Sequence, residues 1–219
     1  MARDADETQI AEIERELGPV TRTGRTHGVT YDGERVWVAI GAQLVACDPQ
    51  SGRQTRALDV AAEAGTAYDG TYLYQITNGV ILKIEPQTGS VLRTIPAPSA
   101  SDSSGLAWAE GSLWVGQYRG RKIVRIDPET GRVLSEVSSN RFVTGVSFCE
   151  GELWHGTLED GESELRHVDR RNGNVLDSAR MPGGTEIHGL ESDGHDRFFC
   201  GGGRDGKVRV VKRPKQAAR

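Results

Sequence analysis

The stretch GLAWAEGSLWVGQYRGRKIVRIDPETGRV, which runs from Gly105 to Val133, decides the fold of this chain. It contains a strand pattern, a tight turn, two further strand patterns, a PETG turn and the start of a fourth strand. Similar units open at four other glycines: Gly28, Gly65, Gly145 and Gly189. A four-stranded unit that repeats about every 40 residues is typical of a β-propeller blade. Five copies therefore predict an all-β, five-bladed propeller of four-stranded antiparallel blades.

The composition indicates one soluble domain. The chain has 219 residues, is 36% hydrophobic and carries a formal net charge of −4. A nucleic-acid partner is not expected, because binding a phosphate backbone needs a basic face. The sequence has neither an apolar run long enough to span a membrane nor an apolar leader segment. Its three cysteines form no CxxC pair, so we predict reduced, structural thiols and a cytoplasmic location, with no membrane partner.

The two ends of the chain are expected to flank the propeller domain, which we place at residues 18–213. Ile10, Ile13 and Leu17 recur at helical spacing, which predicts a short amphipathic helix within residues 1–17. The last blade offers only three strand patterns, so residues 18–24 are expected to supply its fourth strand and close the ring. Residues 214–219 are expected to form a C-terminal tail.

Most of the repeated acids and aromatic residues are interpreted as structural. An acid precedes a glycine in every first hairpin turn, as at Asp32-Gly33 and Glu110-Gly111, where glycine tolerates a positive φ. Aromatic residues recur at the same blade positions, as at Trp37 and Trp114, so they are expected to fill the space between neighbouring blades.

Candidate catalytic residues lie at the mouth of the central channel, where the innermost strands begin. The residues immediately before the five opening glycines are His27, Ala64, Ser104, Thr144 and His188. Two equivalent histidines among five in the chain suggest a shared role in proton transfer near neutral pH or in ligation of a divalent metal. Glu186 lies two residues before His188 and is the third candidate catalytic residue. Hydrogen bonding of the histidines to neighbouring loops remains the alternative.

Candidate substrate-binding residues lie beside this mouth. Arg25 lies two residues before His27, and an extended chain would place both on one side. The loops that join second to third strands should open on the same face, and one of them carries Gln117, Tyr118 and Arg119. Gln75, in a second strand, is a further candidate. His155, also in a second strand, is expected either to approach the mouth or to lie between blades.

Two enzyme families resemble this sequence. THGVTYDGERVWVAI is similar to a blade of the virginiamycin B lyase (streptogramin lyase) group. That resemblance implies a channel-mouth histidine, corresponding to His27 or His188, which with a glutamate and magnesium opens a cyclic depsilactone by elimination. YLYQIT and IVRIDPETGRVL, with the DPxTG-like turns, resemble the plant-type glutaminyl cyclases (glutamine cyclotransferases). That resemblance implies a five-bladed propeller that converts N-terminal glutamine to pyroglutamate with a glutamate placed just before the opening glycine of one blade.

These patterns favour an enzyme that binds a small polar molecule at the channel mouth and acts as a lyase or cyclase. Acid–base histidines would carry the reaction, with metal assistance as a further option. The alternative is a binding or protein-interaction propeller without catalytic activity. The sequence leaves the substrate and the oligomeric state open.

Overall fold

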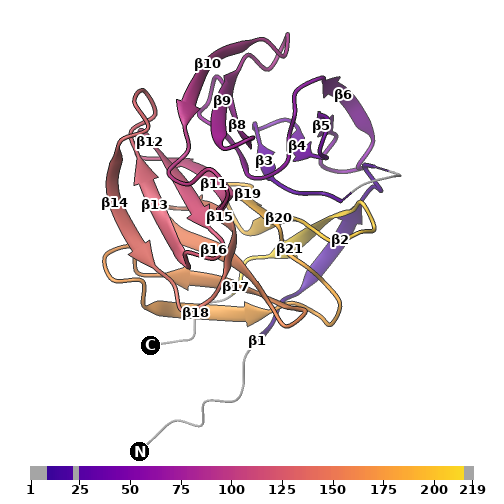
Figure 1. The fold of residues 1–219 in the computed structure, drawn as a ribbon. Helices are drawn as coiled ribbons and strands as arrows, with labels where there is room; N and C mark the ends of the chain where they lie inside the picture. Colours follow the sequence, from indigo (N-terminus) through magenta and orange to yellow (C-terminus); the bar gives the residue numbers. More distant parts are fainter. Residues whose placement is uncertain (1–8, 22–24, 215–219) are drawn as a thin grey trace, which may run out of the picture.

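The chain folds into five β-sheets arranged around a central axis (Figure 1). The computed structural model describes residues 9–21 and 25–214. Blade one contains β3 (Val29–Tyr31), β4 (Val36–Ala39), β5 (Leu44–Cys47) and β6 (Gln54–Leu58). Blade two contains β7 (Thr66–Tyr68), β8 (Leu73–Thr77), β9 (Val80–Ile84) and β10 (Val91–Pro96). Blade three contains β11 (Ser103–Ala109), β12 (Ser112–Gln117), β13 (Lys122–Ile126) and β14 (Val133–Ser138).

The last two blades include strands from the N-terminus. Blade four contains β15 (Val143–Cys149), β16 (Glu152–Glu159), β17 (Glu162–Val168) and β18 (Val175–Arg180), with β1 (Gln9–Ile10) parallel to β18. Blade five contains β19 (Gly189–Ser192), β20 (Arg197–Gly201), β21 (Val208–Lys212) and β2 (Ile13–Leu17), which is antiparallel to β21. Each blade contains four antiparallel strands, to which blade four adds β1 as a fifth, parallel strand, so the predicted five-bladed propeller is confirmed.

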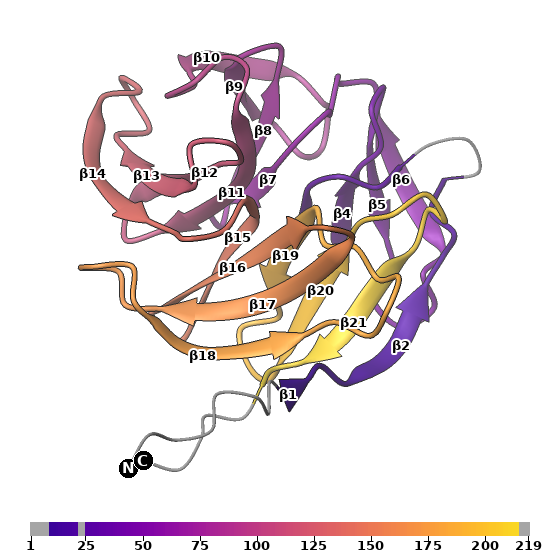
Figure 2. The same ribbon diagram turned by 60° about the horizontal axis from the view of Figure 1, so that its bottom comes forward.

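The N-terminal segment closes the ring, although not with the residues or the structure that the sequence predicted. Figure 2 shows β2 lying along β21 as the outermost strand of blade five. The predicted helix is wrong for residues 9–17, which form strands, and its first residues lie outside the described part. The closing strand ends at Leu17, before the predicted segment 18–24, of which residues 22–24 lie outside the described part. Residues 215–219 of the predicted tail also lie outside it.

The apolar residues at the N-terminus pack on both faces of the observed strand. A register shift between Ile13 and Arg15 places Ile13 opposite Val211 and Leu17 opposite Val208, so the two side chains join different buried clusters. Leu17 is 1% exposed and packs with Val208 and Val210 of β21. Pairing with the open edge of β21 therefore outweighed the helical spacing of Ile10, Ile13 and Leu17, and the segment forms a strand.

The five blade-opening glycines form a ring in which each backbone lies against the next blade. A Cβ on Gly65 would lie 2.4 Å from the amide nitrogen of Leu106, and one on Gly105 would lie 2.7 Å from the carbonyl oxygen of Thr144. The ring closes where a Cβ on Gly189 would lie 2.3 Å from the carbonyl oxygen of His27. Close backbone approach around the axis therefore explains why each blade opens with glycine. It also brings all five preceding residues to one rim.

Apolar side chains fill the spaces between blades. Trp37, from blade one, packs in one buried cluster with Leu73 and Ile84 of blade two. Its indole Nε1 donates a hydrogen bond of 2.7 Å to the carboxylate of Asp32, which also accepts the N–H of Arg35 at 2.6 Å. The turn acids and repeated aromatic residues are thus structural at this position, as predicted. The three cysteines are buried free thiols. Nowhere in residues 9–21 and 25–214 is there a helix with the length and apolarity needed to cross a membrane.

Candidate functional site

A pocket of about 300 Å³ opens at the channel mouth. Its wall includes all five residues that precede the blade-opening glycines: His27, Ala64, Ser104, Thr144 and His188. Glu63, Ser103, Tyr118 and Leu158 complete it. The glycine ring explains this convergence, because it fixes the starts of the five innermost strands at one level around the axis. The pocket lies at the end of the channel that the repeat pattern indicated.

His188 and Glu186 form a hydrogen-bonded pair at this mouth. The Nε2 atom of His188 lies 2.9 Å from Oε2 of Glu186. A neutral imidazole that donates from Nε2 to this carboxylate has its acceptor lone pair on Nδ1. Gly202 makes room for the arrangement, since a Cβ there would lie 3.0 Å from Cδ2 of the His188 ring and 2.3 Å from the Glu186 carbonyl oxygen.

His27 stands beside His188 on the adjoining blade. The two histidines come from blades one and five, which meet where the ring closes, so they are neighbours along the rim. Burial lowers the pKa of His27, and the electrostatic interactions with His188 and Arg25 lower it further, while Glu63 opposes them. The lowered pKa keeps His27 neutral at physiological pH, and a neutral imidazole can accept a proton.

Glu63 adds a carboxylate that the sequence analysis did not select. It lies in the loop before β7, is exposed and lines the pocket. Its Oε2 lies 3.4 Å from the hydroxyl of Thr77 at the end of β8. The signal was present in the sequence, because Glu63 lies two residues before Gly65. Considering the second residue before each opening glycine, as well as the first, would have identified it.

Only some of the predicted substrate-binding residues reach the pocket wall. Tyr118 lines it, whereas Arg25, Gln117 and Arg119 do not. Arg25 acts on His27 through its charge, Gln117 is buried at the end of β12, and Arg119 is exposed. The backbone N–H of Arg119 donates a hydrogen bond of 2.7 Å to Asp102.

Gln75 and His155, two of the candidate substrate-binding residues, are buried and do not line the pocket. Gln75 has no exposed surface, and its amide nitrogen donates to the carbonyl oxygen of Ala64 at 3.1 Å, so it supports the pocket wall from behind. His155 is 1% exposed, and burial lowers its pKa to about 4. Its Nδ1 lies 3.1 Å from the carbonyl oxygen of Gly156.

The donor set at the mouth does not form a metal site. Within the described part of the chain, no three or more His, Cys, Asp or Glu side chains are grouped so that they could hold a metal ion. A divalent metal, which the sequence analysis left as an option, would have too few protein ligands at His27 and His188. The chemistry that these residues offer by themselves is proton transfer, with Glu63 available to bind a cationic group.

Comparison with known proteins finds one matching family model and several structures with a similar fold. A family model described as outer membrane protein assembly factor BamB matches residues 7–148. The structure of Myxococcus xanthus glutaminyl cyclase superposes with a TM-score of 0.73 at 16% identity, covering 93% of this chain and 96% of that one. Virginiamycin B lyase from Staphylococcus aureus has a TM-score of 0.52 at 14% identity, covering 85% of this chain and 66% of that one.

A further similar structure extends the range of proteins with this fold. Kuenenia stuttgartiensis hydrazine synthase has a TM-score of 0.51 at 15% identity, covering 78% of this chain and 52% of that one. A search of curated proteins gave no match. At these identities the structural likenesses establish the propeller fold, and they bear out the resemblance to glutaminyl cyclase and virginiamycin B lyase at that level.

Proposed function

The chain belongs to the propeller family described as outer membrane protein assembly factor BamB, and within that family we propose that it is an acid–base enzyme of the cyclotransferase type. The substrate would be a peptide with an N-terminal glutamine. The observation that carries the proposal is the His188–Glu186 pair at 2.9 Å, which shares one pocket with His27 and Glu63. The likeness to glutaminyl cyclase over 93% of this chain supports the choice of reaction.

The residues have separate roles in this proposal. Glu186 is a positioning residue that holds the His188 ring and fixes its tautomer. His188 is the general base, through the lone pair on Nδ1. His27, kept neutral by burial, accepts a hydrogen bond from the substrate amine. Glu63 attracts the positively charged amino terminus as it enters the pocket.

The proposed reaction balances without a cofactor. The α-ammonium group first loses one proton to solvent. The neutral α-amino nitrogen then attacks the carbon of its own side-chain amide, and a new C–N bond closes the five-membered ring. His188 takes the proton that leaves this nitrogen and returns it to the departing amide nitrogen. The bond between the carbonyl carbon and that nitrogen breaks, and ammonia leaves. The protein contributes orientation and proton transfer, for which general acid–base catalysis supplies about 10²- to 10⁴-fold.

The test is release of ammonia from glutaminyl peptides by the purified protein and by matched histidine variants. His188→Ala should lower kcat/KM by about 100-fold or more and leave the melting temperature unchanged. His195→Ala is the control, because His195 is exposed in the turn between β19 and β20, away from the pocket. Glu186→Gln should shift the pH profile, since the amide holds the ring with a different charge. Full activity in His188→Ala would refute the proposal.

A protein-interaction role is the second candidate, and exposed apolar pairs favour it. The outer strands of blades two, three and four each begin with a valine and a leucine that are more than 40% exposed: Val91–Leu92, Val133–Leu134 and Val175–Leu176. Apolar side chains at equivalent places on three blades could bind an unfolded polypeptide. The description of the family as an assembly factor for outer membrane proteins supports this alternative.

The two candidates respond oppositely to the same variants. Changing Leu92, Leu134 and Leu176 together to serine should abolish binding of an unfolded outer-membrane β-barrel polypeptide if the interaction role is right. Fluorescence anisotropy of the labelled polypeptide measures this binding. His188→Ala should bind it as the wild type does. If the leucine variant binds equally well, the interaction role through these strands is refuted.

A further inference from the structure

We propose that the pocket contains an apolar subsite, formed by Tyr118 and Leu158, for the side chain of the second residue of the substrate. This inference rests on the proposed function, because it assumes that the first residue reacts at His188. The preferred substrate would carry an aromatic or branched aliphatic residue after the N-terminal glutamine.

The pocket wall divides into a polar and an apolar side. His188 and His27 come from blades five and one, and Glu63 from the start of blade two. Tyr118 follows β12 of blade three, and Leu158 lies in β16 of blade four. In a ring of five blades, blade three lies opposite the junction of blades five and one. A substrate that reacts beside the histidines therefore extends toward Tyr118 and Leu158.

Tyr118 is held in place before any ligand binds. Its hydroxyl donates a hydrogen bond to the carbonyl oxygen of Leu158 at 3.3 Å, and its backbone N–H donates to the carbonyl oxygen of Asp102 at 3.0 Å. The Asp102 carboxylate accepts the backbone N–H groups of Arg119 and Gly120 at 2.7 and 2.8 Å. Since the hydroxyl is already engaged with Leu158, Tyr118 offers a ligand mainly its apolar ring.

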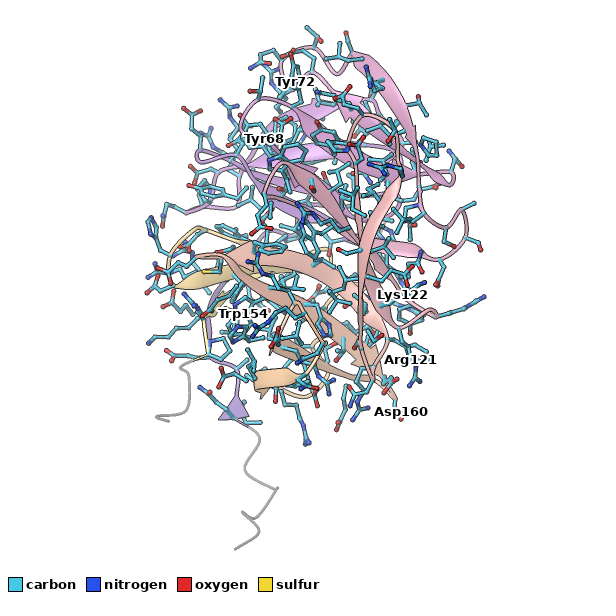
Figure 3. The ribbon with its side chains drawn as sticks, turned by 90° about the vertical axis from the view of Figure 1, so that its left-hand side faces the viewer. Tyr68, Tyr72, Arg121, Lys122, Trp154 and Asp160 are labelled. Carbon is cyan, nitrogen blue, oxygen red and sulfur yellow. The ribbon has the colours of Figure 1, made fainter. Side chains whose placement is uncertain are left out.

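A stack of side chains supports one face of that ring. Phe142 stacks on Tyr118 with a centroid distance of 4.7 Å and an interplanar angle of 23°. The Arg121 guanidinium lies 4.4 Å from the centroid of Phe142 and is ion-paired with Glu159 at 2.9 Å. Figure 3 shows Arg121 and Asp160 at the same end of the molecule, where the hairpins of blades three and four meet. Because Phe142 and Arg121 hold one face of the Tyr118 ring, the rest of the ring forms a rigid part of the pocket wall.

The size of the pocket limits the ligand to about two residues. Its volume of about 300 Å³ lies at the lower end for sites that bind small molecules. Successive residues of an extended peptide are about 3.5 Å apart, so the second side chain is the first group that can leave the polar side. Burying an aromatic ring against Tyr118 and Leu158 favours substrates with such a residue over those with glycine.

The experiment compares kcat/KM for three amides: Gln-Phe, Gln-Leu and Gln-Gly. The wild-type protein should prefer Gln-Phe over Gln-Gly by about tenfold, and Tyr118→Ala should reduce the preference to about twofold or less. Tyr118→Phe keeps the ring and should keep the preference for Gln-Phe, which shows that the ring and not the hydroxyl contact forms the subsite. This variant also provides a test if Tyr118→Ala fails to fold. Tyr72→Ala is the control, because Tyr72 lies on blade two outside the pocket, with Nζ of Lys83 4.5 Å from its ring centroid. Figure 3 shows Tyr72 at the opposite end of the molecule from Arg121.

The outcomes separate this inference from the proposed function. Equal turnover of the three amides would refute the subsite and leave the cyclotransferase activity standing. If no amide is turned over, the activity is refuted, and the subsite is then tested by calorimetric binding of phenylalaninamide and glycinamide. Tighter binding of phenylalaninamide that depends on Tyr118 would support the subsite. Equal or absent binding of the two probes would overturn it.

Discussion

The free energy of unfolding of the wild-type protein should fall as the pH rises from about 5 to 8.5, and replacing Glu191 by glutamine should remove this fall. Glu191 lies in β19 and connects three blades. Its Oε2 accepts a hydrogen bond from the Thr30 hydroxyl of blade one at 2.7 Å, and its Oε1 accepts one from the Ser147 hydroxyl of blade four at 2.8 Å. The backbone N–H of Ser192 donates to Oε1 at 2.9 Å.

Burial sets the sign and the size of this effect. It raises the pKa of Glu191 from 4.5 to about 7, against the three hydrogen bonds that favour the charged form. Between these two pKa values the folded protein binds more protons than the unfolded chain, so the free energy of unfolding falls as the pH rises. The full shift corresponds to about 3 kcal/mol, of which about 2.5 kcal/mol develops between about pH 5 and 8.5. Because part of the side chain is accessible, these values are upper limits.

Urea unfolding of the wild type and of Glu191→Gln at the two pH values measures the effect. The glutamine variant stays neutral, so its free energy of unfolding should change less with pH, and it should exceed that of the wild type at the higher pH. Glu34→Gln is the control, since the Glu34 side chain is 77% exposed in a turn. Equal pH dependence in the wild type and Glu191→Gln would refute the reasoning.

Two further predictions concern closure of the ring. Deleting residues 1–17 removes β2 and exposes the edge of β21, so the melting temperature should fall sharply. Deleting residues 1–12 keeps β2 and should lower the melting temperature less. Equal decreases would show that β2 is not the closing element. Gly105→Ala places a Cβ 2.7 Å from the Thr144 carbonyl oxygen and should destabilise the fold by about 1–3 kcal/mol, whereas Gly183→Ala meets no atom within 4 Å. Similar urea midpoints for the two alanine variants would contradict the close packing of the glycine ring.

The sequence predicted the propeller well because each blade repeats the same local signals. Glycines at turns and at the axis, and aromatic residues such as Trp37 and Trp114, recur at equivalent positions and agree on one structure. The N-terminus has no second copy with which to compare it. Its strand depends on pairing with β21, a contact distant in sequence that no local pattern encodes.

The candidate site was predictable where it followed the repeat. His27 and His188 were found because they precede equivalent glycines, and Tyr118 because it lies in a loop at the same face. Whether Gln75 and His155 reach the pocket or stay in the interior depends on how neighbouring blades pack. The alternation of residues along a strand does not specify this packing. The spacing of Glu186 and His188 only suggested that the two side chains pair. Their hydrogen bond depends on the backbone conformation of the segment before β19.

The position of the histidines at the ring closure links the proposed site to the stability of the fold. Blade five is complete only when β2 pairs with β21, and blade five carries both His188 and Glu186 at its inner edge. On the adjoining blade, the hydroxyl of Thr26 accepts a hydrogen bond of 2.8 Å from the backbone N–H of Gly202. A Cβ on Gly202 would lie 3.0 Å from Cδ2 of the His188 ring. The two histidines are therefore held together by the same contacts that join the first blade to the last. A site built at this junction keeps its geometry only while the ring is closed, so its activity should depend on the N-terminal strand more directly than a site within one blade would.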